Sequence, residues 1–210
     1  MSNTRVQQQD PAEVLKNFFR VYGKYVIAFF VVIFVLYIGS TIYTSHQNTK
    51  NLESASVYQK FSQAVTAKNT NTMAQIVSSL QQNYKSSPYT AMASIQLAKS
   101  LYSNNDYVAA ATNLNWVIIN AQSANYVDMA KLDLAKVYIQ QGNMNAAHDI
   151  LLSAHSAAFD VPYLEEQGDM YVVQGDTQKA ISAYKEALSK SQGDEQASQL
   201  LDFKLGVIGG

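Results

Sequence analysis

Cysteine is absent from the 210-residue chain. Disulfides, thiolate metal sites and cysteine nucleophiles are therefore excluded. A surplus of one charge is also missing, because 15 Lys and Arg residues face 16 Asp and Glu residues and the net charge is −1. Without a basic surplus, the chain is not expected to bind nucleic acid.

Recognisable catalytic motifs are absent as well. The sequence has neither a glycine-rich phosphate loop nor a G-x-S-x-G nucleophile motif. His148 and His155 are seven residues apart, too far for two metal ligands on one helical turn, and His46 stands alone. The neighbouring Glu165 and Glu166 suit a solvated helix face. We therefore expect exposed, inert histidines, no metal or cofactor, and no enzymatic activity.

A run of 19 uncharged, mostly apolar residues extends from Tyr25 to Tyr43. A helix of this length rises about 28 Å, close to the ~30 Å hydrocarbon thickness of a bilayer. Tyrosines near its ends are typical of membrane–water interfaces. A buried core helix rarely lacks charge over such a length, and a cleaved signal peptide has a shorter apolar run. The sequence predicts an uncleaved, single transmembrane helix at 25–43.

The basic residues around this run are unevenly distributed. After the run, only Lys50 and Lys60 occur in a stretch of comparable length. Four precede it: Arg5, Lys16, Arg20 and Lys24. The positive-inside rule then places segment 1–24 in the cytoplasm and the C-terminal domain across the membrane, in the periplasm if the host is Gram-negative. Residues 11–22 predict a helix that either lies in the interface or continues the membrane helix.

Two segments near the C-terminus, 132–154 and 165–188, superpose with a shift of 33 residues. A more degenerate copy, 94–118, precedes them by a shift of 37. The matched positions are small, turn-forming or large: Ala98, Ala135 and Gly168; Asn105, Gly142 and Gly175; Ala110, Ala147 and Ala180; Leu114, Leu151 and Tyr184. A helix–turn–helix period near 34 residues is typical of tetratricopeptide repeats.

The spacing has a physical basis. A small residue at the first matched position lets the two helices of a repeat approach closely. Gly142, Gly175 and, in the first copy, Asn105 supply a left-handed turn between the helices. One repeat cannot bury its apolar face alone, so the copies stack. The sequence therefore predicts an all-α protein, in which a single N-terminal transmembrane helix precedes a tetratricopeptide-like helical-repeat solenoid.

The solenoid divides into three parts. Residues 44–86 form an irregular first helix pair, with Leu52 on the apolar face of its first helix and without glycine or small crossing residues. Residues 87–190 hold the three repeats. Residues 191–210 form a cap helix and a tail, in which Leu200, Leu201 and Leu205 face inward and Gly206, Gly209 and Gly210 fray the C-terminus.

The candidate functional surface is the concave groove that the first helix of each repeat lines. Methionines and aliphatic residues with a few mixed charges suit an adaptable surface for extended or unfolded polypeptide. Cover by neighbouring helices is the alternative. The groove-facing register gives Met92, Ile95, Lys99 and Tyr102, then Met129, Leu132, Lys136 and Ile139, then Glu165, Asp169 and Val172.

Several stretches together resemble the YfgM-type ancillary subunits of the bacterial Sec translocon, over nearly the whole chain. They lie on both sides of the apolar run and inside the repeats. They are Glu13 to Phe19, Tyr22 to Lys24, Ser45 to Gln47, then Ala91, Ala93, Ser94, Leu97 and Ala98, then Leu132 to Lys136, and Gly168 to Leu188.

The resemblance implies a periplasmic repeat domain held beside the Sec channel in the bacterial inner membrane. It implies association with translocon subunits and with a membrane-anchored periplasmic chaperone of the peptidyl-prolyl isomerase type. It also implies a role in passing secreted polypeptides to soluble periplasmic chaperones. The alternative is a tethered scaffold for another envelope complex, such as cell-division or peptidoglycan machinery.

Overall fold

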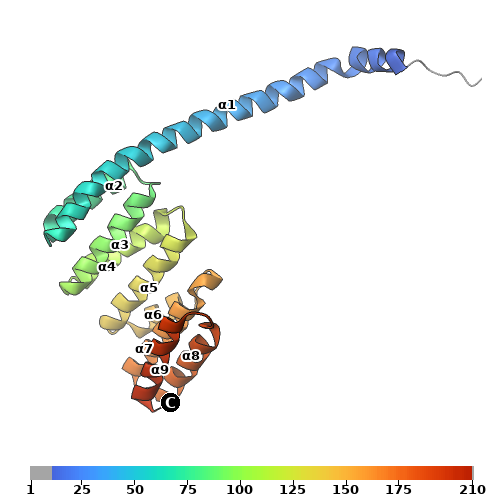
Figure 1. Ribbon diagram of the computed structural model, residues 1–210. Helices are drawn as coiled ribbons and strands as arrows, with labels where there is room; N and C mark the ends of the chain where they lie inside the picture. Colours follow the sequence, from blue (N-terminus) through green and yellow to red (C-terminus); the bar gives the residue numbers. More distant parts are fainter. Residues whose placement is uncertain (1–10, 210) are drawn as a thin grey trace, which may run out of the picture. The chain divides into compact units, whose positions relative to one another are not determined.

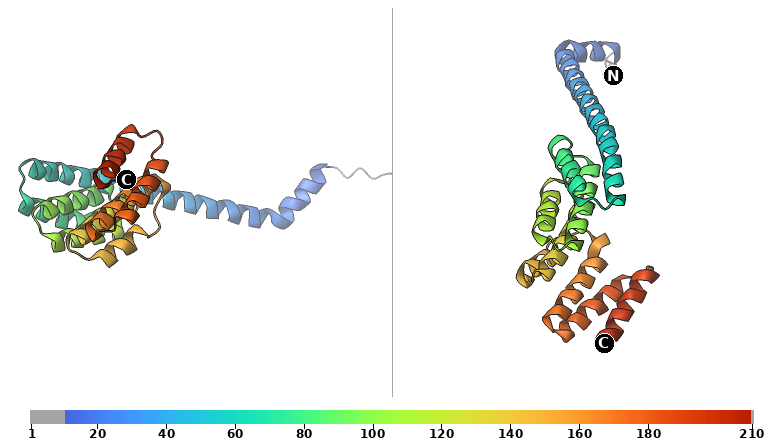
Figure 2. Two further views of the ribbon diagram at one scale, coloured as in Figure 1. Left: turned by 90° about the horizontal axis from the view of Figure 1, so that it is seen from below. Right: turned by 90° about the vertical axis from the view of Figure 1, so that its left-hand side faces the viewer.

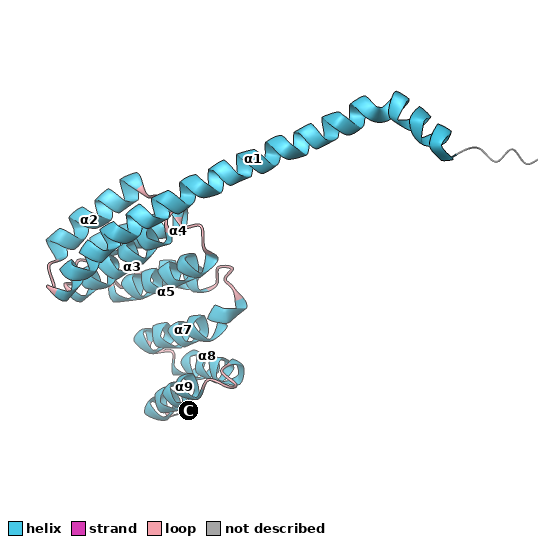
Figure 3. Cartoon of the chain, turned by 45° about the horizontal axis from the view of Figure 1, so that its top comes forward, coloured by secondary structure: helices cyan, strands magenta, loops and turns pink. Residues whose placement is uncertain are grey.

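The computed structural model describes residues 11–209, with the side chains of 49–209 and of part of the stretch 16–41. Over this range all regular structure is helical, which confirms the all-α prediction (Figure 3). Expectations for Arg5 and Gly210 lie outside the described residues. The helices are α1 Pro11–Thr66, α2 Thr70–Asn83, α3 Pro88–Ser103, α4 Tyr107–Asn120, α5 Ala124–Gln140, α6 Met144–Leu151, α7 Asp160–Gln174, α8 Thr177–Lys190 and α9 Glu195–Ile208, with a 3-10 turn at Ala157–Phe159.

The chain divides into two compact units, residues 1–49 and 50–210. In the first unit, the large side chains from Phe29 to Ile38 are exposed on α1. Among the described residues, no helix is both long enough and apolar enough to span a membrane. The transmembrane helix expected at 25–43 is therefore not confirmed.

The second unit is a stack of helices in which each one contacts the next from α2 to α9 (Figures 1 and 2). The first helices of successive repeats also contact each other, α3 with α5 and α5 with α7. Buried side chains from three consecutive helices fill three of the cores: Ala98 of α3, Leu114 of α4 and Leu134 of α5 share one. In the last core the buried side chains come from α8 and α9. This arrangement is the predicted helical-repeat solenoid.

The predicted left-handed turns are confirmed. Asn105, Gly142 and Gly175 have φ angles of 63°, 75° and 76°. In each turn the next residue caps the following helix: Asp106 accepts a hydrogen bond from the Ala109 N–H at 3.1 Å, and Asn143 and Asp176 accept equivalent bonds. The turn and cap together satisfy backbone groups at both helix ends.

A fourth turn of the same kind joins α1 to α2, where the sequence offers no glycine. Lys68 has φ 52°, and Asn69 accepts from the Thr72 N–H at 3.0 Å. Lys68 precedes Asn105 by 37 residues, the same interval that separates Asn105 from Gly142. Phe61 and Met73, both buried, occupy the positions that are small in the later repeats. The first pair therefore shares the repeat's turn but has larger side chains in its core.

Three expectations at the ends of the solenoid are wrong. Leu52 and Leu200 are exposed, because each points away from the core that its helix covers. Leu201 and Leu205 are buried as expected. Gly206 lies inside α9, which ends only at Ile208 with Gly209 as a left-handed cap.

Gly168 is the tightest point in the last repeat. A Cβ at this position would overlap the ring of Tyr184 on α8. The second repeat places Ala135 and Leu151 at the matching positions, both buried in one core. Gly168 is smaller than Ala135 and Tyr184 is larger than Leu151, so the combined volume of the two side chains is similar in the two repeats.

We expect Gly168→Ala to lower the free energy of unfolding by about 1–3 kcal/mol, because the added methyl group overpacks the contact with Tyr184. Gly206→Ala is the matched control: no atom lies within 4 Å of its Cβ, so the same change should stabilise α9 by up to about 1 kcal/mol. Gly168→Ala combined with Tyr184→Leu should recover most of the loss. Urea denaturation measures all three, and a loss in both single variants would contradict this packing.

Lys68→Gly should raise the free energy of unfolding by up to about 1 kcal/mol, since glycine adopts a positive φ without the steric cost that lysine has there. Lys85→Gly is the control, because Lys85 lies in a loop without positive φ and should lose stability through chain entropy. Thermal unfolding compares the two. Equal shifts of the same sign would contradict the strain assigned to Lys68.

Candidate functional site

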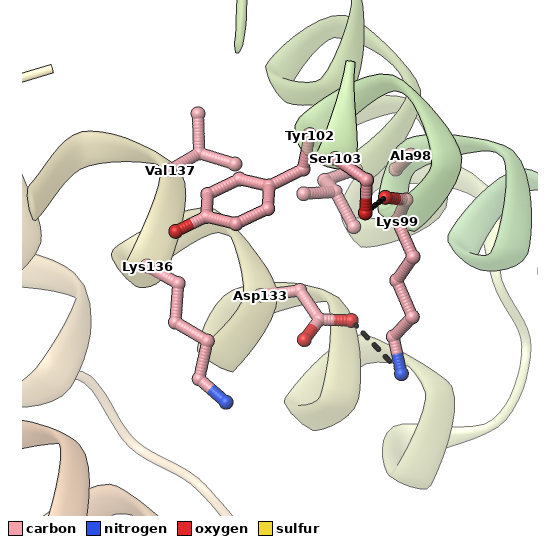
Figure 4. A pocket seen from close by; sticks show the side chains of 8 residues that line it. Ala98, Lys99, Tyr102, Ser103, Asp133, Lys136 and Val137 are labelled. Carbon is pink, nitrogen blue, oxygen red and sulfur yellow. Dashed lines mark hydrogen bonds and ion pairs between the residues drawn. The ribbon is translucent and has the colours of Figure 1, made fainter. Parts of the chain in front are cut away.

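A crevice of about 300 Å³ opens between α3 and α5 (Figure 4). We call it the α3–α5 crevice. Its walls are the first helices of two successive repeats. Lys99 and Tyr102 line it from α3, and Asp133 and Lys136 line it from α5. The full lining is Ala98, Lys99, Tyr102, Ser103, Leu114, Asp133, Lys136 and Val137.

A second crevice, of about 330 Å³, opens between α5 and α7. We call it the α5–α7 crevice. It shares Tyr102 and Lys136 with the first, so the two are adjacent and form one surface, which we call the groove. Its full lining is Tyr102, Leu132, Lys136, Ile139, Gln140, Pro162, Glu165, Glu166 and Asp169.

Ion pairs connect the successive first helices across these crevices. Lys99 Nζ on α3 lies 3.6 Å from Asp133 Oδ2 on α5. Lys136 Nζ on α5 lies 3.5 Å from Glu166 Oε2 on α7. In both pairs the carboxylate is much more buried than the lysine. The groove therefore has charged walls whose charges are partly neutralised within the fold.

Burial alters the acidity of both carboxyl groups. It raises the pKa of Glu166 to about 7, although the Lys136 ammonium group opposes the shift. It also raises the pKa of Asp133 above its usual range, against the opposing effects of Lys99 and Lys136. Each carboxylate is thus costly to ionise where it lies.

The next ion-pair cluster joins α7 to α9. Lys204 Nζ donates hydrogen bonds of 2.7 Å to Glu165 and to both carboxylate oxygens of Asp169. The Tyr184 hydroxyl donates to Asp169 at 2.6 Å, and burial raises its pKa, so it keeps its proton. Burial lowers the pKa of Lys204, but its hydrogen bonds outweigh that effect and raise it overall. Lys204 thereby links the cap helix α9 to α7 at this end of the groove.

The structure brings together seven of the eleven predicted groove residues. They are Lys99, Tyr102, Leu132, Lys136, Ile139, Glu165 and Asp169. Ile95 is only 4% exposed and lies in the α3–α4–α5 core, where a partner could not reach it. Met92 and Met129 are half-buried and Val172 is exposed, and none of the three lines either crevice.

The acidic partners of the groove lysines were not predicted. Asp133 was not singled out, and the expectation that Glu166 lies on a solvated helix face is wrong, because Glu166 is only 8% exposed. Asp133 and Glu166 lie three residues before the predicted groove residues Lys136 and Asp169. They were not included in the face of each helix that was predicted to line the groove. Lys204 was missed because α9 was expected only to cover the end of the stack. A search for opposite charges on neighbouring first helices could have found all three.

Among the described residues, no group of histidine and carboxylate side chains could hold a metal ion. The expectation of an exposed His155 is wrong. Its ring stacks on Tyr163 with centroids 3.9 Å apart, and its Nε2 lies 3.4 Å from Asp160 Oδ1. His155 therefore packs in the loop between α6 and α7. His148, half-buried on α6, also differs from the expectation of an exposed side chain, and the side chain of His46 lies outside the described residues.

The repeat geometry agrees with sequence comparison, since a family model described as a tetratricopeptide repeat-like domain matches residues 16–210. The chain belongs to this family. Proteins named "Ancillary SecYEG translocon subunit" also match: one from Neisseria gonorrhoeae is 29% identical, covering 95% of this chain and 96% of its own. The one from Escherichia coli is 25% identical, and the match covers 94% of this chain and 95% of that protein. The one from Haemophilus influenzae is 23% identical, with 95% of this chain and 97% of that protein covered.

The resemblance to translocon ancillary subunits that the sequence predicts is therefore confirmed. The match to the family model begins at residue 16 and therefore includes residues of both units. No solved structure matches the chain.

The stability of the fold should depend on pH through Glu166. Its pKa is 4.5 when unfolded and about 7 when folded, so the folded state binds more protons between these values. Stability from this group is therefore present at low pH and is lost as the pH rises from about 4.5 to about 7.

Glu166→Gln should remove this dependence. The free energy of unfolding of the variant, minus that of the parent protein, should be up to about 3 kcal/mol larger at pH 8 than at pH 4.5. Urea denaturation at both pH values measures the difference. Glu186→Gln, which alters an exposed carboxyl group on α8, is the control. An equal difference at both pH values would contradict the assignment.

Proposed function

We propose that the protein is a non-enzymatic scaffold, tethered in the bacterial inner membrane, that associates with the Sec translocon. The observation that carries this proposal is the match to proteins named as ancillary translocon subunits across nearly the full length of both chains. A fold built from helical repeats supports it, because such folds present extended binding surfaces. The described residues offer no metal cluster that would favour an enzyme instead.

The tether in this proposal is a transmembrane helix at 25–43. The run carries no charge, and its large side chains from Phe29 to Ile38 are exposed on α1. A bilayer would remove that apolar surface from water. In this proposal segment 1–24 lies in the cytoplasm and the repeat unit in the periplasm, which is the orientation that the basic residues before the run favour.

The role of the repeat unit in this proposal is to hold secreted polypeptides as they leave the translocon. The groove offers apolar lining from Tyr102, Leu132 and Ile139 beside paired charges. A membrane-anchored chaperone of the peptidyl-prolyl isomerase type is the further proposed partner. The scaffold would pass chains from the channel to such periplasmic chaperones.

The orientation can be tested with cysteine variants, because the chain has no cysteine of its own. A membrane-impermeant maleimide added to intact spheroplasts should label Ser103→Cys in the repeat unit. It should label Ser2→Cys only after the membrane is opened with detergent. Labelling of the Ser2 variant in intact spheroplasts, or protection of the Ser103 variant, would contradict the proposed topology.

Purification of the full-length protein in a mild detergent, followed by mass spectrometry, should recover translocon subunits as its most abundant partners. A second form, in which an unrelated apolar helix replaces residues 25–43, tests whether the span itself contacts the translocon. We expect this form to recover several-fold less. Recovery of septal or peptidoglycan enzymes in place of translocon subunits would overturn the proposal and favour another envelope complex.

A further inference from the structure

The charge that faces solvent is positive at the α3 end of the groove. The side chains of Lys99 and Lys136 are 51% and 49% exposed, whereas those of Asp133 and Glu166 are 19% and 10% exposed. Both ammonium groups are therefore more accessible to solvent than the carboxylates they pair with; Figure 4 shows Lys99, Lys136 and Asp133. A partner that approaches this end meets positive charge first.

At the α7 end the carboxylates, not the lysine, are the more exposed members of the ion pairs. Glu165 and Asp169 are 26% and 38% exposed, and the lysine that both contact, Lys204, is 21% exposed. Two carboxylates face one ammonium group, so one negative charge remains uncompensated in this cluster. A partner that approaches here meets negative charge first.

Lys99 lines only the first crevice and Glu165 and Asp169 only the second, and apolar side chains lie beside them. Tyr102 lines both crevices, and Leu132, Ile139 and Pro162 line the second. Cavities of about 300 and 330 Å³ accommodate one or two side chains each, not a folded domain. These volumes suit an occupant that inserts separate side chains, as an extended segment does.

We propose that the groove selects an extended polypeptide segment by the order of its charges: an acidic residue over Lys99 and Lys136, an apolar side chain beside Tyr102, and a basic residue at Glu165 and Asp169. This inference rests on the proposed function, because it specifies the polypeptide that the scaffold holds. A segment with only one sign of charge meets like charge at one end, which disfavours it.

The test uses full-length protein in detergent with a single cysteine on either side of the groove. Ser103→Cys lies in the α3–α5 crevice and Gln140→Cys in the α5–α7 crevice. The probe is a synthetic peptide in the order Asp, apolar residues, Lys, with a chloroacetyl group beside either the Asp or the Lys. The Asp-end probe should label the Ser103 variant at least about fivefold faster than the Gln140 variant, and the Lys-end probe the reverse.

The outcomes separate this inference from the proposed function. Equal labelling of both variants by both probes would overturn the charge order while leaving a polypeptide-binding groove intact. A reversed pattern would overturn it in the same way. No labelling above the rate of free cysteine would overturn both the inference and the polypeptide-holding role of the groove, but not association with the translocon.

A charge reversal gives an independent measurement. Lys99→Glu should weaken binding of the fluorescent Asp–apolar–Lys peptide by roughly tenfold, and a peptide with Lys in place of its Asp should recover most of that loss. Lys185→Glu, an exposed change on α8, is the control and should leave binding unchanged. Thermal unfolding checks that each variant is folded. Equal weakening for both peptides would contradict the inference.

Discussion

The solenoid depends on the contact between a small residue on the first helix of each repeat and a large one on the second. Gly168 faces Tyr184 so closely that no side chain fits between them. Where the first residue is Ala135, the second shrinks to Leu151. Because the two volumes compensate, the helix pairs can stack in the same way despite different sequences. This regular stacking brings successive first helices side by side, and the groove exists because of it.

The groove in turn depends on where that stacking places charge. Contact between α3 and α5, and between α5 and α7, carries Asp133 and Glu166 beneath the surface. Lysines are long enough to reach these carboxylates and still keep their ammonium groups in water. Buried carboxylates are costly to ionise, so the pairs contribute little net stability. Their effect is on the surface, where they fix which sign of charge a partner meets.

The sequence predicts the repeats well because their signals are local. A residue that tolerates a left-handed turn is recognisable at Asn105, Gly142 and Gly175, and the structure has positive φ at all three. Lys68 escaped detection because lysine carries no such signal. Its neighbour Asn69 does, since an Asn or Asp cap follows every one of these turns. The cap is therefore a better marker of this repeat than the glycine.

The groove was less predictable, because it depends on how neighbouring helices align. Projecting one helix face finds Lys99 and Lys136 but cannot show that Asp133 and Glu166 lie opposite them. The alignment also determines how the groove would bind. A partner must share or displace charges that are already paired, which limits affinity and favours rapid release. At the α7 end, Glu165 and Asp169 share an ion pair with Lys204, so affinity is limited in the same way there. Such a groove suits the proposed scaffold, which must release each chain, better than it would suit a protein that stores one.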